Sequence, residues 1–145
     1  MSNVNTITDQ LSINAGSSGA IVMTFAAPTN QSANVVFNCT TVGTAGGTPT
    51  EFSVGICDSL SGGTSASLTQ THIRANRSET PQGTWLTWSG GAPSAVSGAI
   101  RERIIVPCLS SGFTPPVEVP GGKTAYLFIK NATTTATLIT GKCNQ

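Results

Sequence analysis

The chain has 145 residues, of which 38% are hydrophobic and only 9% are charged, and its net charge is +1. This length fits one domain with one hydrophobic core. The near-zero net charge speaks against nucleic acid or an anionic membrane as a partner, because both favour a basic surplus. It also speaks against disorder, since disordered chains combine low hydrophobicity with high net charge.

Apolar and polar residues alternate with a period of two along much of the chain, which predicts short β-strands. The first pattern is weak: Ile7, Leu11 and Ile13 suit either an edge strand or an extended arm. Stronger patterns follow in chain order at 20–27, 34–41, 51–57, 67–74, 84–88, 100–109, 124–130 and 134–143. The run 124–130 is apolar almost throughout, which is typical of a strand buried on both faces.

Clusters of glycine, proline and serine separate these patterns, for example at 16–19, 43–49 and 90–93. Residues 110–123 are expected to form an irregular loop, because they are rich in proline, which cannot donate to a ladder. The sequence therefore predicts an all-β fold, a single antiparallel β-sandwich or jelly-roll-like domain of about eight or nine short strands. The domain would cover 13–145, and residues 1–12 would form the extended N-terminal arm.

The core follows from the inward positions of the predicted strands, since side chains two apart share a face. We expect it to contain Val22, Phe25, Val35, Phe37, Phe52, Val54, Ile56, Ile104, Val106, Leu127, Ile129 and Leu138.

The four cysteines are Cys39, Cys57, Cys108 and Cys143, and no two form a CxxC pair, so a tetrahedral zinc site has little support. They could form two disulfides or stay as buried thiols. Strand alternation places Cys39 and Cys108 inward and Cys57 on the face opposite Phe52. If bridges form, we expect Cys39 to pair with Cys108 and Cys57 with Cys143.

Catalytic chemistry has little support. His72 is the only histidine, and no GxSxG elbow accompanies it and Asp58 to suggest a nucleophilic triad. The six acidic residues are scattered, and Glu102 between Arg101 and Arg103 is explained by charge matching on a strand. Calcium loops and phosphate-binding glycine loops are missing as well. The sequence predicts no enzyme, with no catalytic, metal or cofactor site.

The aromatic residues suggest a second kind of function, because Trp85, Trp88 and Tyr126 could offer a stacking platform for carbohydrate. Trp85 and Trp88 are three apart and so point to opposite faces of a regular strand. One of them would then fill the core and the other would be exposed. Arg74 and Arg77 lie in a polar segment at 72–83, which suits a rim contact to a neighbouring protein.

Charge is unevenly distributed, since residues 1–50 contain no Lys or Arg and only one acid, Asp9. This region either forms a solvent face rich in Ser, Thr and Asn or is buried against another subunit, because interface cores are poor in charge. The second alternative makes the arm from Met1 to Leu11 a candidate contact with neighbouring subunits.

Low charge, richness in Ser, Thr, Gly, Ala and Asn, and short Val/Ile strands, in stretches such as 20–28, 84–93 and 121–131, resemble small virion proteins of tailed bacteriophages. The resemblance is to capsid decoration (cement) proteins and to minor tail or spike proteins. It implies a non-enzymatic structural protein, a homo-oligomer such as a trimer, bound to the major capsid protein or other virion subunits. It also implies location in the virion, after assembly in the host cytoplasm.

Four cysteines are more than such a protein needs, and they favour the alternative of a secreted carbohydrate- or receptor-binding module. No basic n-region or apolar h-region follows Met1, so that alternative requires a signal peptide removed before this chain begins.

Overall fold

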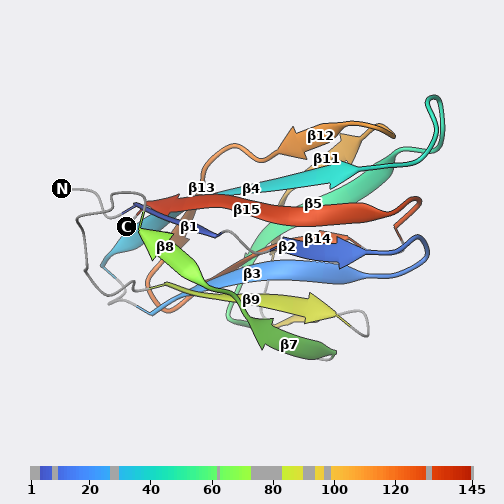
Figure 1. Ribbon diagram of the computed structural model, residues 1–145. Helices are drawn as coiled ribbons and strands as arrows, with labels where there is room; N and C mark the ends of the chain where they lie inside the picture. The colour runs from blue at the N-terminus through green and yellow to red at the C-terminus, as the bar shows by residue number, and fades with distance from the viewer. Residues whose placement is uncertain are drawn as a thin grey trace.

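The computed structural model describes residues 4–7, 10–26, 30–61, 63–72, 83–89, 94–96, 99–129 and 132–144. For 4–7, 10, 71–72, 94–96, 99–100 and 138–144 only the backbone is described. These parts form two antiparallel sheets packed face to face, as Figure 1 shows. The predicted β-sandwich is thus confirmed. Within the described ranges there is no helix that could span a membrane.

The first sheet has seven strands, which pair in the order β12-β4-β15-β1-β8, while β13 also pairs with β4 and β2 also pairs with β15. Their bounds are β1 Val4–Ile7, β2 Gln10–Ile13, β4 Ser32–Thr41, β8 Gln70–His72, β12 Ser111–Phe113, β13 Val117–Pro120 and β15 Ala136–Asn144.

The second sheet has six strands in the order β11-β5-β14-β3-β9-β7. Their bounds are β3 Gly19–Phe25, β5 Thr50–Cys57, β7 Thr64–Ser67, β9 Gly83–Ser89, β11 Ala99–Val106 and β14 Thr124–Ile129. A separate pair joins β6 (Ser59–Ser61) to β10 (Ser94–Val96). The edge strands β11 and β12 lie on the same side of the sandwich (Figure 1).

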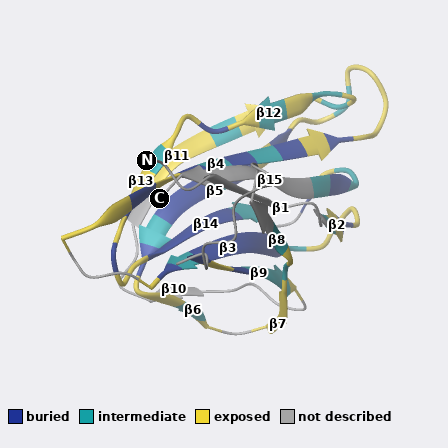
Figure 2. Cartoon of the chain, turned by 60° about the vertical axis from the view of Figure 1, so that its left-hand side comes forward, coloured by how far each residue is buried: buried dark blue, intermediate teal, exposed yellow. Residues whose placement is uncertain are grey.

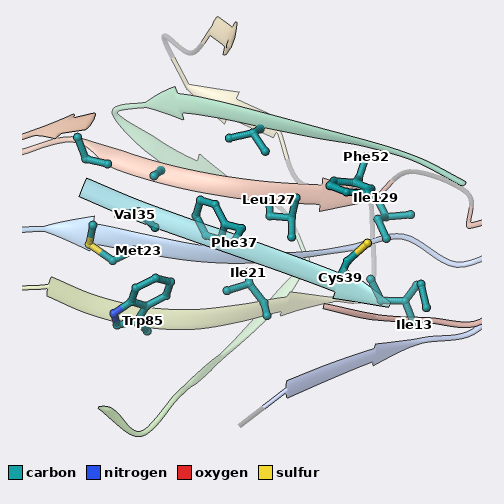
Figure 3. Close-up of a cluster of buried hydrophobic side chains, with 14 of the residues drawn as sticks. Ile13, Ile21, Met23, Val35, Phe37, Cys39, Phe52, Trp85, Leu127 and Ile129 are labelled. Carbon is teal, nitrogen blue, oxygen red and sulfur yellow. The ribbon is translucent and has the colours of Figure 1, made fainter. Parts of the chain in front are cut away.

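The main core fills the space between the two sheets, and Figure 3 shows its side chains converging from both. At its centre the ring of Phe37 from β4 meets the indole of Trp85 from β9 edge to face, with centroids 6.0 Å apart. Eight predicted core residues are buried here: Phe25, Val35, Phe37, Phe52, Val54, Val106, Leu127 and Ile129. Ile104 is half-buried against this core, and the side chain of Leu138 lies outside the described part.

A second, smaller cluster covers the outer face of the second sheet. Its buried members are Ala20, Val22, Cys57 and Tyr126, and the half-buried side chains packed on them are Leu60, Leu86, Trp88 and Phe128. Val22 is therefore buried as expected, but on the face opposite Phe25. Strands β3 and β14 are covered on both sides, which confirms the prediction for 124–130 (Figure 2).

The expected loop at 110–123 contains two short strands, β12 and β13, both paired with β4. Proline is compatible with this arrangement because Pro115 and Pro116 lie between the strands and Pro120 ends β13. The prediction of an unpaired loop is therefore wrong.

The N-terminal stretch is not a free arm in this structure. Residues 4–7 form β1, which pairs with both β15 and β8, and residues 10–13 form β2, which pairs with β15. The predicted strand 67–74 is also divided. β7 ends at Ser67 in the second sheet, and β8 begins at Gln70 in the first, so the chain changes sheets between them.

Candidate functional site

The three cysteines whose side chains are described are free thiols. Cys39 is buried in the main core and Cys57 lies on the opposite face of β5 from Phe52, as its position in the strand predicted. Cys108 follows the end of β11, where it is half-buried and donates to the carbonyl of Thr48 at 3.4 Å. The proposed bridge between Cys39 and Cys108 is therefore not formed here, and the side chain of Cys143, the proposed partner of Cys57, is outside the described residues.

The structure describes the residues considered for catalysis only in part. The backbone of His72 is in β8, and its side chain is outside the described part. Asp58 lies at the end of β5 and forms an ion pair with Lys123. Glu51 lies 3.9 Å from Arg103 on the outer face of the second sheet. Among the described residues no three His, Cys, Asp or Glu side chains are grouped as a metal site.

Trp85 and Trp88 point to opposite faces of β9, as their spacing predicted. Trp85 is buried in the main core, while Trp88 is half-buried on the outer face of the second sheet. Tyr126 shares the outer face, but it is 6% exposed and cannot offer a stacking surface. The three-residue platform considered from the sequence is thus reduced to Trp88.

A pocket of about 240 Å³ lies beside Trp88, and we call it the Trp88 pocket. Its lining is Val22, Thr24, Asp58, Ser59, Leu60, Leu86, Trp88 and Thr124. These residues come from β3, β6, β9, β14 and the turn after β5. Because they are far apart in the chain, no sequence motif predicts the pocket.

Burial governs the ionisation of the groups next to this pocket. Burial, together with the negative charge of the neighbouring Asp58, raises the pKa of Cys57 to about 11. Burial also raises the pKa of Tyr126. Both groups are therefore neutral at physiological pH, and the one acidic side chain in the pocket lining is that of Asp58, which forms an ion pair with Lys123.

The position of Trp88 depends on Gly63 in the neighbouring turn. Gly63 has a φ of 71°, and a Cβ placed there would lie 3.1 Å from the indole nitrogen and 2.6 Å from the carbonyl oxygen of Ser89. Only glycine allows the turn to approach the indole this closely. The indole is therefore held from one side by backbone.

The second feature consists of exposed apolar residues in or beside the edge strands β11 and β12, which carry much exposed surface (Figure 2), and we call it the β11–β12 edge. Its members are Val42, Ile105, Leu109 and Phe113, with exposures of 51%, 65%, 61% and 71%. Ile104 and Gly112 face the core, so Ile105 points outward from the second sheet and Phe113 points outward from the first. A backbone bond from Thr41 to the carbonyl of Ser110 brings Val42 and Leu109 to the same corner.

Leu109 adopts a φ of 59°, the left-handed conformation that costs a residue with a Cβ about 1–2 kcal/mol. It is the one non-glycine residue with positive φ among those described. Hydrogen bonds between Thr41 and the next residue, Ser110, hold the turn that contains it. The strained backbone therefore presents an apolar side chain to the surface at this corner.

A groove of about 510 Å³ opens on the same side of the sandwich, between β11 and β13. Its apolar lining includes Ile56, Val117 and two prolines, Pro115 and Pro116. Ile56 was predicted to be core and is only half-buried, because its side chain lines this groove. Charged residues on the rim are Arg101, Glu102, Glu118 and Lys123.

None of the residues that the sequence suggested for an interface is found on the exposed surface of the described part. Leu11 is half-buried against the main core, while Met1, Arg74 and Arg77 are outside the described residues. Sequence patterns did not identify Leu109 or Phe113 as surface contacts. Leu109 was predicted to end the strand at 100–109, whereas β11 ends at Val106, and Phe113 lies in a strand too short to show periodicity.

Comparison with known proteins finds no match: no family model, no curated protein and no solved structure resembles the chain closely enough to be significant.

Proposed function

We propose that this protein is a non-enzymatic structural component of a virus particle, of the kind that decorates a capsid and stabilises it through contacts with neighbouring subunits. The observation that carries the proposal is the β11–β12 edge. Four large apolar side chains are exposed there, and one of them, Leu109, is held in a strained conformation. Interface centres are apolar and poor in charge.

The contact at this edge would be made by side chains and not by adding a strand. β11 is an edge strand, but it has a bulge between Ile100 and Glu102 and carries Arg101, Glu102 and Arg103 in succession. Bulges and charges of this kind block edge-to-edge pairing. The apolar residues beside them remain available for packing against a partner.

A specific interface buries about 1,000 Å² or more in total, so these four residues would supply only part of its area, and the partner would have to contact both sheets at this edge. The adjoining groove between β11 and β13 extends the apolar surface through Val117 and the two prolines Pro115 and Pro116. The major capsid protein or another virion subunit is the partner we expect.

The test is an inventory of purified particles by mass spectrometry, in which a decorating protein should occur in a near-stoichiometric ratio to the major capsid protein. Phe113→Lys should weaken attachment, because it places a charge within the proposed interface. Thr64→Lys is the matched control, since Thr64 is exposed on β7 at the opposite edge of the second sheet.

Leu109→Gly separates attachment from stability. Glycine relieves the left-handed strain, so the melting temperature should not fall, while attachment should weaken. If both lysine variants attach equally well, the β11–β12 edge is not the interface. If the protein is not found on any particle, the structural proposal is wrong.

A second candidate function is that of a carbohydrate- or receptor-binding module, and the Trp88 pocket is the observation that favours it. The pocket places one half-buried indole beside a carboxylate and two threonine hydroxyls. Such a protein should bind a glycan array and should be scarce in particles or absent from them.

A further inference from the structure

We infer that the Trp88 pocket binds a single neutral pyranose ring, such as the terminal sugar of a glycan. The inference deepens the second candidate function and rests on it. It depends on four properties of the pocket: its two-sided lining, its hydrogen-bonding groups, its size and its charge.

The lining is divided into an apolar side and a polar side. Val22, Leu60, Leu86 and Trp88 form the apolar side, and Thr24, Asp58, Ser59 and Thr124 form the polar side. A pyranose ring is divided in the same way, with C–H groups on its face and hydroxyls around its rim. The ring would therefore lie with its face on the indole and its rim toward Asp58.

The indole of Trp88 is half-buried and has small neighbours across the sheet. Across the two adjacent strands Trp88 pairs with Ala20 on β3 and with Ser65 on β7. Neither paired residue is large enough to cover the indole, and Gly63 lies against its edge. A fixed aromatic surface loses little conformational entropy when a ligand binds.

The polar side is also held in place before any ligand binds. The hydroxyls of Thr24 and Thr124 are 2.9 Å apart, and Thr124 donates to the backbone carbonyl of Asp58 at 3.4 Å. The Asp58 carboxylate is paired with Lys123, and both side chains are about half exposed. A carboxylate has two oxygens that accept several hydrogen bonds, so Asp58 can serve two adjacent sugar hydroxyls, while Lys123, outside the pocket lining, balances its charge.

The size of the pocket and its balance of charge restrict the class of ligand further. At about 240 Å³ the pocket is smaller than the roughly 300–1,000 Å³ of sites for drug-sized molecules, so it fits one ring and not an internal stretch of a polysaccharide. The charges of Asp58 and Lys123 cancel. A neutral hexose is therefore favoured over a sialic or uronic acid.

The experiment is a glycan array with the full chain, followed by titration of the best terminal monosaccharide, monitored by tryptophan fluorescence and calorimetry. Trp88→Ala should abolish measurable binding. Asp58→Asn should weaken it about tenfold, the change expected for one hydrogen bond to a charged group. This surface variant keeps the shape of the side chain, so it tests the site even if Trp88→Ala folds poorly.

Two matched controls address the same outer face. Phe128→Ala removes a half-buried aromatic that does not line the pocket, and Glu51→Gln neutralises an exposed carboxylate that is paired with Arg103. Both should bind the sugar as the unmodified protein does.

The outcomes separate the inference from the function on which it rests. If no glycan binds, the second candidate function is wrong, and the inference fails with it. If a glycan binds but Trp88→Ala and Asp58→Asn bind it unchanged, the protein binds carbohydrate elsewhere, and only the inference is wrong. Preference for acidic sugars would contradict the argument from charge.

Discussion

Replacing Phe37 with alanine should remove the main contact between the two sheets at the centre of the core. Phe37 is 0% exposed, and its ring meets the indole of Trp85 on the other sheet edge to face. The backbone N–H of Phe37 donates to the Thr114 hydroxyl at 3.0 Å, and its carbonyl accepts from the Thr114 N–H at 2.9 Å. Alanine keeps both backbone bonds, so the loss of stability reports on the ring.

The expected cost is about 3–5 kcal/mol in the free energy of unfolding, the range for deleting a fully buried phenylalanine side chain. Of this, about 0.5–1.5 kcal/mol belongs to the aromatic pair itself. Since whole domains are stable by only about 5–15 kcal/mol, the variant should be close to unfolding at ambient temperature.

Urea denaturation followed by tryptophan fluorescence measures this cost, because Trp85 changes from a buried to an exposed environment on unfolding. Phe113→Ala is the matched control, since Phe113 is 71% exposed and its loss should change the stability by no more than about 0.5 kcal/mol. A double-mutant cycle with Trp85→Leu isolates the pair term. A cost for Phe37→Ala below about 1 kcal/mol, or one equal to that of Phe113→Ala, would refute the assignment of Phe37 to the core.

Three further predictions concern the thiols and one glycine. In the folded protein a thiol reagent should modify the half-buried Cys108 well before the buried Cys39 and Cys57. Peptide mapping that found a disulfide between Cys39 and Cys108 would contradict the free thiols of the structure. Burial raises the pKa of Cys39 from 9.0 to about 12 and that of Cys57 to about 11. The folded state therefore keeps both protons where the unfolded chain loses them, so stability should fall as the pH rises from about 9 to 11, and Cys39→Val should make the fall shallower. Gly63→Ala should lower the stability by at least about 1–2 kcal/mol, because Gly63 has a positive φ and the added Cβ would press against the carbonyl oxygen of Ser89. A thermal melt measures this loss, and an unchanged melting temperature would mean that the turn relaxes freely.

The sequence was sufficient for the properties that depend on neighbouring residues along one strand. Alternation identified the long strands and most of the core between the sheets, because side chains two apart share a face whatever the strand pairs with. The same rule placed Trp85 and Trp88 on opposite faces and separated Cys57 from Phe52. The apolar run at 124–130 showed that β14 is covered on both faces.

Only the tertiary structure decided which strands pair and what lies beside each edge. Strands β12 and β13 have little pattern of their own, and they form because β4 offers them a partner. The Trp88 pocket joins Val22 to Thr124, and the strain at Leu109 depends on a turn that periodicity does not describe. Alternation is a local property, whereas pairing, pockets and edges depend on contacts between residues far apart in the chain, and one sequence carries no direct record of those contacts.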